Sequence, residues 1–242
     1  MSVWTFPHRT RSNSVAAAQL PQPVSSRGQI YRTSETDALE VISTSVLTND
    51  FVKVSLKNVS NKNVNGIQLA INGGILQVEF LDATRPDDQR IPAGGIYEET
   101  FPFNGAVTVE VAILAVTFDD NTSSGIPSLA DEIFDTRRGV KQQLKRFESL
   151  LGEARKYPDA DSIAVLDHLR TQVEDLPAQD LKESGAMRMG QLQAKQEIIQ
   201  EIDFMKERLI RDPGSTTVSQ TLSEIESRHE QRLRTIEGTT KQ

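Results

Sequence analysis

Three histidines are the natural starting point for chemistry, because imidazole can bind a metal or transfer a proton near neutral pH. His8, His168 and His229 lie in separate segments, and none has the second histidine four residues away that a helical zinc motif requires. The chain also lacks cysteine, a G-x-S-x-G elbow, a phosphate-binding loop and a G-x-G-x-x-G fingerprint. We therefore expect no catalytic residue, cofactor or metal ligand, and we interpret His229 as a packed residue of the last helix.

One polar stretch matches part of a calcium-loop template. Asp120, Thr122, Ser124, Gly125 and Asp131 occupy offsets 1, 3, 5, 6 and 12 of that template. The template requires carboxylate or amide ligands at offsets 3 and 5, a glutamate at offset 12 and a preceding helix, whereas here hydroxyls, an aspartate and a strand take those places. We interpret the stretch as a polar hinge between sheet and helix.

A basic stretch lies in the first expected helix. Arg137, Lys141 and Lys145 recur every four residues and share one helix face, with Arg138 and Arg146 beside them. Such a face is usually solvated, but it could also contact an acidic partner, anionic lipid or nucleic acid. No aromatic residues interleave to stack on bases, so no nucleic acid is expected. Arg137, Lys141 and Lys145 are therefore candidate partner contacts.

Composition indicates a folded, acidic protein with two kinds of structure. The 242 residues carry 27 basic and 34 acidic side chains, a formal net charge of −7. No apolar run reaches the roughly 18 residues of a membrane span. Charged residues number 16 of 88 in residues 38–125 but 39 of 117 in residues 126–242. The sparser segment is typical of sheet, and the denser one is typical of solvent-facing helices.

In residues 38–125, apolar and polar residues alternate with a period of two, and turn signals separate these stretches. The expected strands cover about 39–46, 51–57, 67–71, 76–80, 97–103 and 107–118. Short strands at this spacing predict an antiparallel β-sandwich and exclude a parallel α/β sheet, whose strands would be apolar on both faces. Because the chain has no cysteine pair and no strand tryptophan, the sandwich would be of the fibronectin-like sort.

From residue 126 onward, apolar residues recur at helical steps. The breaks predict four helices, over about 128–157, 162–173, 177–209 and 218–236, and their short connections favour a helical bundle. Ile199 and Ile202 belong to an apolar stripe on the third helix, and this stripe is broader than contact with one neighbouring helix requires. Either the other helices close this stripe, or it stays open to a second copy or to a partner's helix, which makes Ile199 and Ile202 candidate contacts.

Residues 1–37 are rich in Ser, Arg, Gln and Pro and have no sustained period, which indicates a disordered or loosely attached segment. Within them, Val15–Ala18 resembles a secretory cleavage site, and Arg9 and Arg11 precede it. The apolar stretch that should lie between these features is absent. We interpret Val15–Ala18 as an accidental alanine run in a loose segment, and a displaced or altered start of an exported protein is the alternative. Among locations, we slightly favour a periplasmic or extracellular one over a cytoplasmic one.

Two stretches carry a family resemblance. Val54–Ser60, with the return strand that starts near Gly66, resembles a strand and Asn-x-Ser pattern of small bacterial immunoglobulin-like accessory domains. Ile91–Gly95 and the strand after it are similar to a turn and strand of the same modules, which include cell-adhesion-related and FxLYD-type sandwiches. The resemblance covers about 80 residues, roughly Ala38–Asp120. It implies a binding or spacer module at a bacterial surface or periplasm, and it brings no catalytic residues.

Together the patterns predict an α+β protein: a loosely attached segment at 1–37, an antiparallel immunoglobulin-like β-sandwich at 38–125 and an α-helical bundle at 126–242. We expect a non-enzymatic protein–protein interaction or structural module in the bacterial envelope, with a protein partner, no transmembrane segment and a homo-oligomer formed through the helical domain. A carbohydrate-binding accessory module, or an envelope enzyme that uses the sandwich loops, stays open as the alternative. The aromatic content of 5% speaks against carbohydrate binding.

Overall fold

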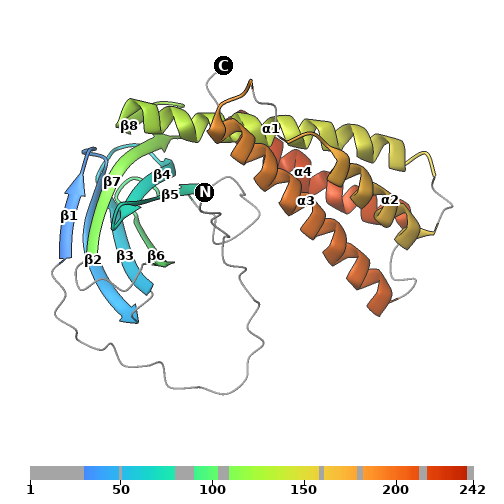
Figure 1. The fold of residues 1–242 in the computed structure, drawn as a ribbon, viewed down its shortest axis with the longest axis horizontal. Helices are drawn as coiled ribbons and strands as arrows, with labels where there is room; N and C mark the ends of the chain where they lie inside the picture. The colour runs from blue at the N-terminus through green and yellow to red at the C-terminus, as the bar shows by residue number, and fades with distance from the viewer. Residues whose placement is uncertain are drawn as a thin grey trace.

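All strands precede all helices along the chain. The computed structural model describes residues 30–48, 51–79, 90–102, 109–157, 161–178, 182–212 and 217–238. Two sheets lie at one end of the molecule and the helices at the other, and one long helix joins the two parts (Figure 1). The protein is therefore mixed α+β, as the change of period near residue 125 predicts.

The strands form two sheets. One sheet has the order β1-β7-β4-β5, with β8 also paired to β7, and the other has the order β2-β3-β6. Every pairing is antiparallel except β1 with β7. The strands are β1 Ile30–Ser34, β2 Leu39–Thr48, β3 Phe51–Asn58, β4 Val64–Ile71, β5 Gly74–Glu79, β6 Ile96–Pro102, β7 Val109–Phe118 and β8 Ser123–Gly125.

One hydrophobic cluster fills the space between the two sheets. Because side chains alternate across a strand, Val52, Val54 and Leu56 of β3 point into this cluster, while Lys53 and Lys57 point away. In β7 the alternation shifts after Ile113, where the pairing with β4 passes over Leu114 as a bulge. The alternation that predicted the strands is thus the pattern that buries one face of each sheet.

The strand β1 departs from the sequence expectation. Residues 30–37 were expected in a loosely attached segment, but Ile30–Ser34 pair in parallel with Val109–Ile113 of β7. Thr36 is buried, and its hydroxyl lies 2.6 Å from that of Ser124 in β8. β1 and β8 therefore lie end to end along one edge of β7. The Val15–Ala18 stretch lies outside the described residues.

Four helices follow, each starting at a recognisable residue. They are α1 Pro127–Ala154, α2 Ser162–Asp175, α3 Gly185–Arg211 and α4 Val218–Glu237. Pro127 opens α1, whereas the side chains of Asp161, Ser184 and Thr217 accept backbone hydrogen bonds at the starts of α2, α3 and α4. The third helix starts at Gly185 and not at Pro177 as expected, because the capping residue is Ser184.

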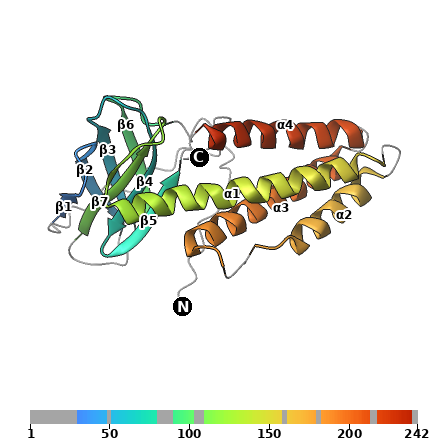
Figure 2. The same cartoon turned by 90° about the horizontal axis from the view of Figure 1, so that it is seen from above.

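The helix α1 belongs to both halves of the molecule (Figure 2). Its first turns pack on β4, β7 and β8 through Ala130, Ile133 and Phe134. Its later turns, from Val140 to Ala154, enter a second hydrophobic cluster together with α2, α3 and α4. No helix among the described residues has the length and apolar character to cross a lipid bilayer.

The backbones of α1 and α3 approach closely at two glycines. A Cβ atom built on Gly139 would lie 2.0 Å from the carbonyl oxygen of Met187, and one built on Gly190 would lie 2.0 Å from that of Thr136. Only glycine leaves room for such an approach. These two positions fix where α3 crosses α1.

Candidate functional site

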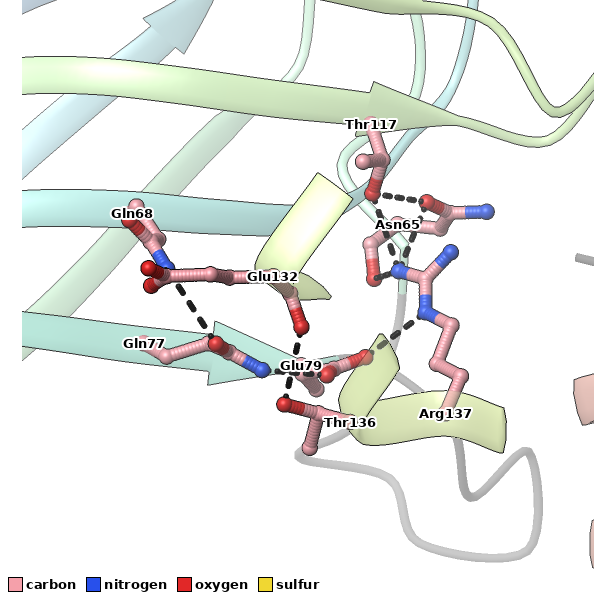
Figure 3. A network of polar contacts seen from close by, with 8 residues as sticks. All are labelled: Asn65, Gln68, Gln77, Glu79, Thr117, Glu132, Thr136 and Arg137. Atoms are coloured by element: carbon pink, nitrogen blue, oxygen red, sulfur yellow. Dashed lines mark hydrogen bonds and ion pairs between the residues drawn. The ribbon is translucent and has the colours of Figure 1, made fainter. Parts of the chain in front are cut away.

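The most elaborate polar cluster in the described chain surrounds Arg137, where α1 crosses the outer face of the larger sheet (Figure 3). The Arg137 side chain has no exposed surface. Its Nη2 donates to the backbone and side-chain oxygens of Asn65 on β4, both at 3.0 Å, and to the Thr117 hydroxyl on β7 at 2.9 Å. Its Nε donates to Glu79 Oε2 at the end of β5 at 2.7 Å. One side chain of α1 therefore contacts three strands.

A glycine makes room for the guanidinium. A Cβ atom on Gly66 would lie 2.5 Å from Arg137 Nη2 and 2.6 Å from Thr117 Oγ1. Any larger residue at this position would displace the arginine. The backbone of β4 is thus part of the recess that accepts the side chain.

The polar contacts continue along β4 and β5 beneath α1 (Figure 3). Gln77 donates to Glu79 at 2.6 Å, and Gln68 lies 3.3 Å from both Gln77 and Glu132 of α1. Gln68 itself is buried. The β5 side of this interface is therefore polar, whereas the first turns of α1 pack on β7 and β8 with apolar side chains.

The charges in this cluster compensate one another. Burial raises the pKa of the Glu79 carboxyl above its ordinary value, and the Arg137 charge and its hydrogen bond oppose that rise. The guanidinium also lies 5.6 Å from the centroid of the Phe134 ring. A buried charge is tolerated only when it is paired and hydrogen-bonded, and the strand residues meet that requirement for Arg137.

This arrangement positions α1 on the sheet and presents no reactive group to a substrate. The guanidinium binds groups of the protein itself, and its partners are amide, hydroxyl and carboxylate oxygens held beneath a helix. We interpret the cluster as a joint, which we call the Arg137 joint: Arg137, Asn65, Thr117 and Glu79.

The partners of Arg137 were not expected from the sequence. The spacing of four predicts a shared, usually solvated face for Arg137, Lys141 and Lys145, because it places all three on one side of a helix. Arg137 is buried instead, since that side of α1 passes from the sheet to the helices within one turn. Gly66 inside a strand was the available signal, because such a glycine often marks a close approach of another group.

Lys141 and Lys145 find an acidic partner within the same chain. Their Nζ atoms lie 3.1 Å and 3.5 Å from Glu237 Oε1 at the end of α4. This ion pair lowers the pKa of Glu237. Contact with another protein stays a prediction for these two residues.

The two isoleucines of α3 differ in exposure. Ile202 is fully buried in the cluster formed by the four helices, and Ile199 is half-buried at its margin. The described helices thus cover the Ile202 side of the stripe. The role of either residue in binding a partner stays a prediction.

The partial calcium template is occupied by protein groups. Asp120 Oδ1 accepts hydrogen bonds from the backbone and hydroxyl of Thr122, and Asp120 Oδ2 lies 2.7 Å from Lys62 Nζ. These contacts lower the pKa of Asp120 to about 2. Within the described ranges, no three His, Cys, Asp or Glu residues gather as a metal site would require.

The histidines do not meet in the described part of the chain. His229 is buried on α4, with Nε2 2.8 Å from Glu201 of α3 and its ring edge-on to Phe147 of α1 at 4.9 Å. His168 is exposed on α2, and His8 lies outside the described residues. The packed interpretation of His229 agrees with its burial.

Comparison with known proteins identifies no relative: no family model, no curated protein and no solved structure matches this chain. The site must therefore be understood from its own geometry.

Proposed function

We propose that this protein is a non-enzymatic interaction module in which α1 holds a β-sandwich and a helical bundle in one orientation and presents both to a protein partner. The observation that carries the proposal is the burial of Arg137 in bonds to three strands. A connecting helix that needed only to link two parts would not require a buried charge at its base. A fixed orientation matters when a partner contacts both parts at once.

The order of the strands supports an immunoglobulin-like assignment for the sandwich. Constant-type immunoglobulin domains place strands A, B, E and D in one sheet and C, F and G in the other, and variable-type domains add C′ and C″ to the second sheet. No described strand corresponds to D or C″. Assigning β2, β3 and β6 to A, B and E leaves β4, β5, β7 and β8 as C, C′, F and G. The parallel strand β1 is an addition to that scheme.

The site of action that we propose is the bacterial envelope. The support is the resemblance of residues 38–120 to bacterial accessory domains, which act as binding or spacer modules. Fractionation of the source cells, followed by detection of the full chain, tests this part separately from the binding function.

The binding function is tested by capture from the source cells with the full chain, its Arg137→Met variant and the matched Arg138→Met variant. Arg138 is half-exposed and pairs with Asp135 of its own helix, so its loss leaves the joint intact. We expect the wild type and Arg138→Met to retain the same partner, and Arg137→Met to retain several-fold less while circular dichroism shows a folded chain.

Two results would contradict the proposal. One is enzymatic turnover by the purified chain in a substrate screen, and the other is equal capture by a folded Arg137→Met variant. If Arg137→Met unfolds, the double variant Arg137→Met/Glu79→Leu replaces it in the capture experiment, because this variant removes both buried charges together.

A further inference from the structure

The helix α4 packs against α1 and α3, and we call the surface that these two helices present to it the groove. The apolar side of α4 enters the helical cluster through five buried residues: Val218, Leu222, Ile225, Leu233 and Ile236. They belong to the same cluster as Leu144 and Phe147 of α1 and Ile198 and Ile202 of α3. An amphipathic helix in an apolar groove is a recurring mode of protein recognition.

The two sides of this groove carry opposite charge. On the α1 side, Lys141 and Lys145 meet Glu237 of α4, and Arg155 pairs with Glu226. Basic residues of α1 and of its C-cap thus meet acids of α4 at two places on this side.

On the α3 side the signs are reversed. Glu201 lies 3.3 Å from Arg228, and Glu197 pairs with Arg232. Arg208 and Glu224, 3.0 Å apart, are the exception at the far end. The groove therefore suits a helix that carries acids on one flank and bases on the other, which is the charge pattern of α4.

We propose that this groove also accepts α4 from a second copy of the chain, so that two copies exchange their last helices and form a dimer. This inference rests on the proposed interaction function and names a partner for it. A second copy supplies a helix with identical apolar spacing and identical flanking charges. Each contact of α4 in the helical cluster can then form between copies, so that protein concentration governs the balance between monomer and dimer.

The packing of α4 favours the exchange. Its main contacts among the described elements are with α1 and α3. No strand contacts α4 as extensively as α1 does, so its release leaves the Arg137 joint and the sheets in place.

The first test uses the native full chain. Unlabelled and ¹⁵N-labelled copies are mixed over a range of concentrations, and a carbodiimide joins Lys141 to Glu237 as an amide. We expect cross-linked peptides that contain one labelled and one unlabelled partner, in a fraction that rises with concentration. Cross-links within single copies only, at every concentration, would overturn the exchange.

The second test uses complementary charge reversals in the full chain. One variant carries Lys141→Glu/Lys145→Glu and the other carries Glu237→Lys, so each alone places like charges at the end of α4. In an exchanged heterodimer both grooves regain opposite charges. We expect mixing to favour the heterodimer by about tenfold over either variant alone in light scattering.

A matched pair of reversals serves as the control. Lys156→Glu in one copy and Glu153→Lys in the other disturb a local ion pair at the end of α1, which exchange of α4 cannot restore. Equal heterodimer formation in both pairs would overturn the proposal. Failure of the exchange would leave capture of a different protein intact, so the two outcomes separate this inference from the proposed function.

Discussion

At the scale of single residues, Arg137 shows how a charged side chain becomes part of an interior. Asn65 and Thr117 supply neutral acceptors, and Glu79 supplies the opposite charge. Removing one member of such a pair leaves the other charge buried without compensation, whereas removing both need not destabilise the fold. The cost of a substitution therefore depends on what remains beside it.

Arg137→Met should lower the free energy of unfolding by about 3–5 kcal/mol, because Glu79 is left buried beside a neutral chain. The double variant Arg137→Met/Glu79→Leu should recover most of this loss. Urea unfolding of the two single variants and the double variant measures the coupling directly. Additive effects of the two substitutions would show that the two side chains do not act as a pair.

Asp120 gives a pH-dependent prediction at the same scale. Its pKa lies at about 2 in the folded chain, below the ordinary value of 3.8, because Lys62 and Thr122 bind the carboxylate. A depressed pKa contributes stability that is complete above the ordinary value and is lost as the pH falls through the folded value.

Between pH 4 and pH 2 the melting temperature of the wild type should therefore fall more steeply than that of Asp120→Asn. Differential scanning calorimetry over this range compares the two. Identical slopes would mean that the Lys62 pair does not persist in solution.

At the scale of elements, the crossing of α1 and α3 depends on Gly139 and Gly190. Alanine at either position places a methyl group against backbone, so the helices must separate. Overpacking of this kind costs about 1–3 kcal/mol. Gly152 of the same α1 helix has open space around it, and Gly152→Ala should stabilise the chain by about 0.5–1 kcal/mol. Thermal unfolding should show a lower melting temperature for Gly139→Ala and Gly190→Ala. It should show a higher one for the control Gly152→Ala.

The apolar stripe of α3 gives a second prediction for an element. Because Ile202 has no exposed surface, Ile202→Asp buries an unpaired charge and should cost several kcal/mol at every protein concentration. The half-buried Ile199 offers the comparison, and Ile199→Asp should cost less. Circular dichroism and light scattering on both variants measure stability and association. A folded Ile202→Asp monomer would contradict the burial of this residue.

At the scale of the whole molecule, α1 joins the outer face of the larger sheet to the helical cluster. Ala130 and Ile133 pack on the sheet side, and Leu144 and Phe147 belong to the helical cluster. A continuous helix that packs on the sheet at one end and belongs to the helical cluster at the other transmits the loss of either part to the other.

Hydrogen exchange should therefore give the amides of β7 and of both halves of α1 the same opening free energy. Mass spectrometry of peptides from 109–118, 129–137 and 140–151 measures it. A value for β7 that differs from one shared by both halves of α1 would instead indicate two independently stable domains that divide near residue 125.

The sequence by itself determined most of the elements. Val52, Val54 and Leu56 alternate because a strand places successive side chains on opposite faces, and Val140, Leu144 and Leu151 recur because a helix turns every 3.6 residues. These local periods predicted six strands and four helices. They missed β1 and β8, which are short and owe their place to the edge of β7.

Only the tertiary structure decided what the charged residues do. Arg137, Lys141 and Lys145 have the same spacing and the same charge, yet one is buried against three strands and the other two pair with the end of α4. Helical periodicity assigns a residue to a face, but it cannot say which distant element covers that face at each turn. That depends on where α1 passes from the sheet to the helices, and the passage is set by the recess at Gly66 and the crossing at Gly139 and Gly190.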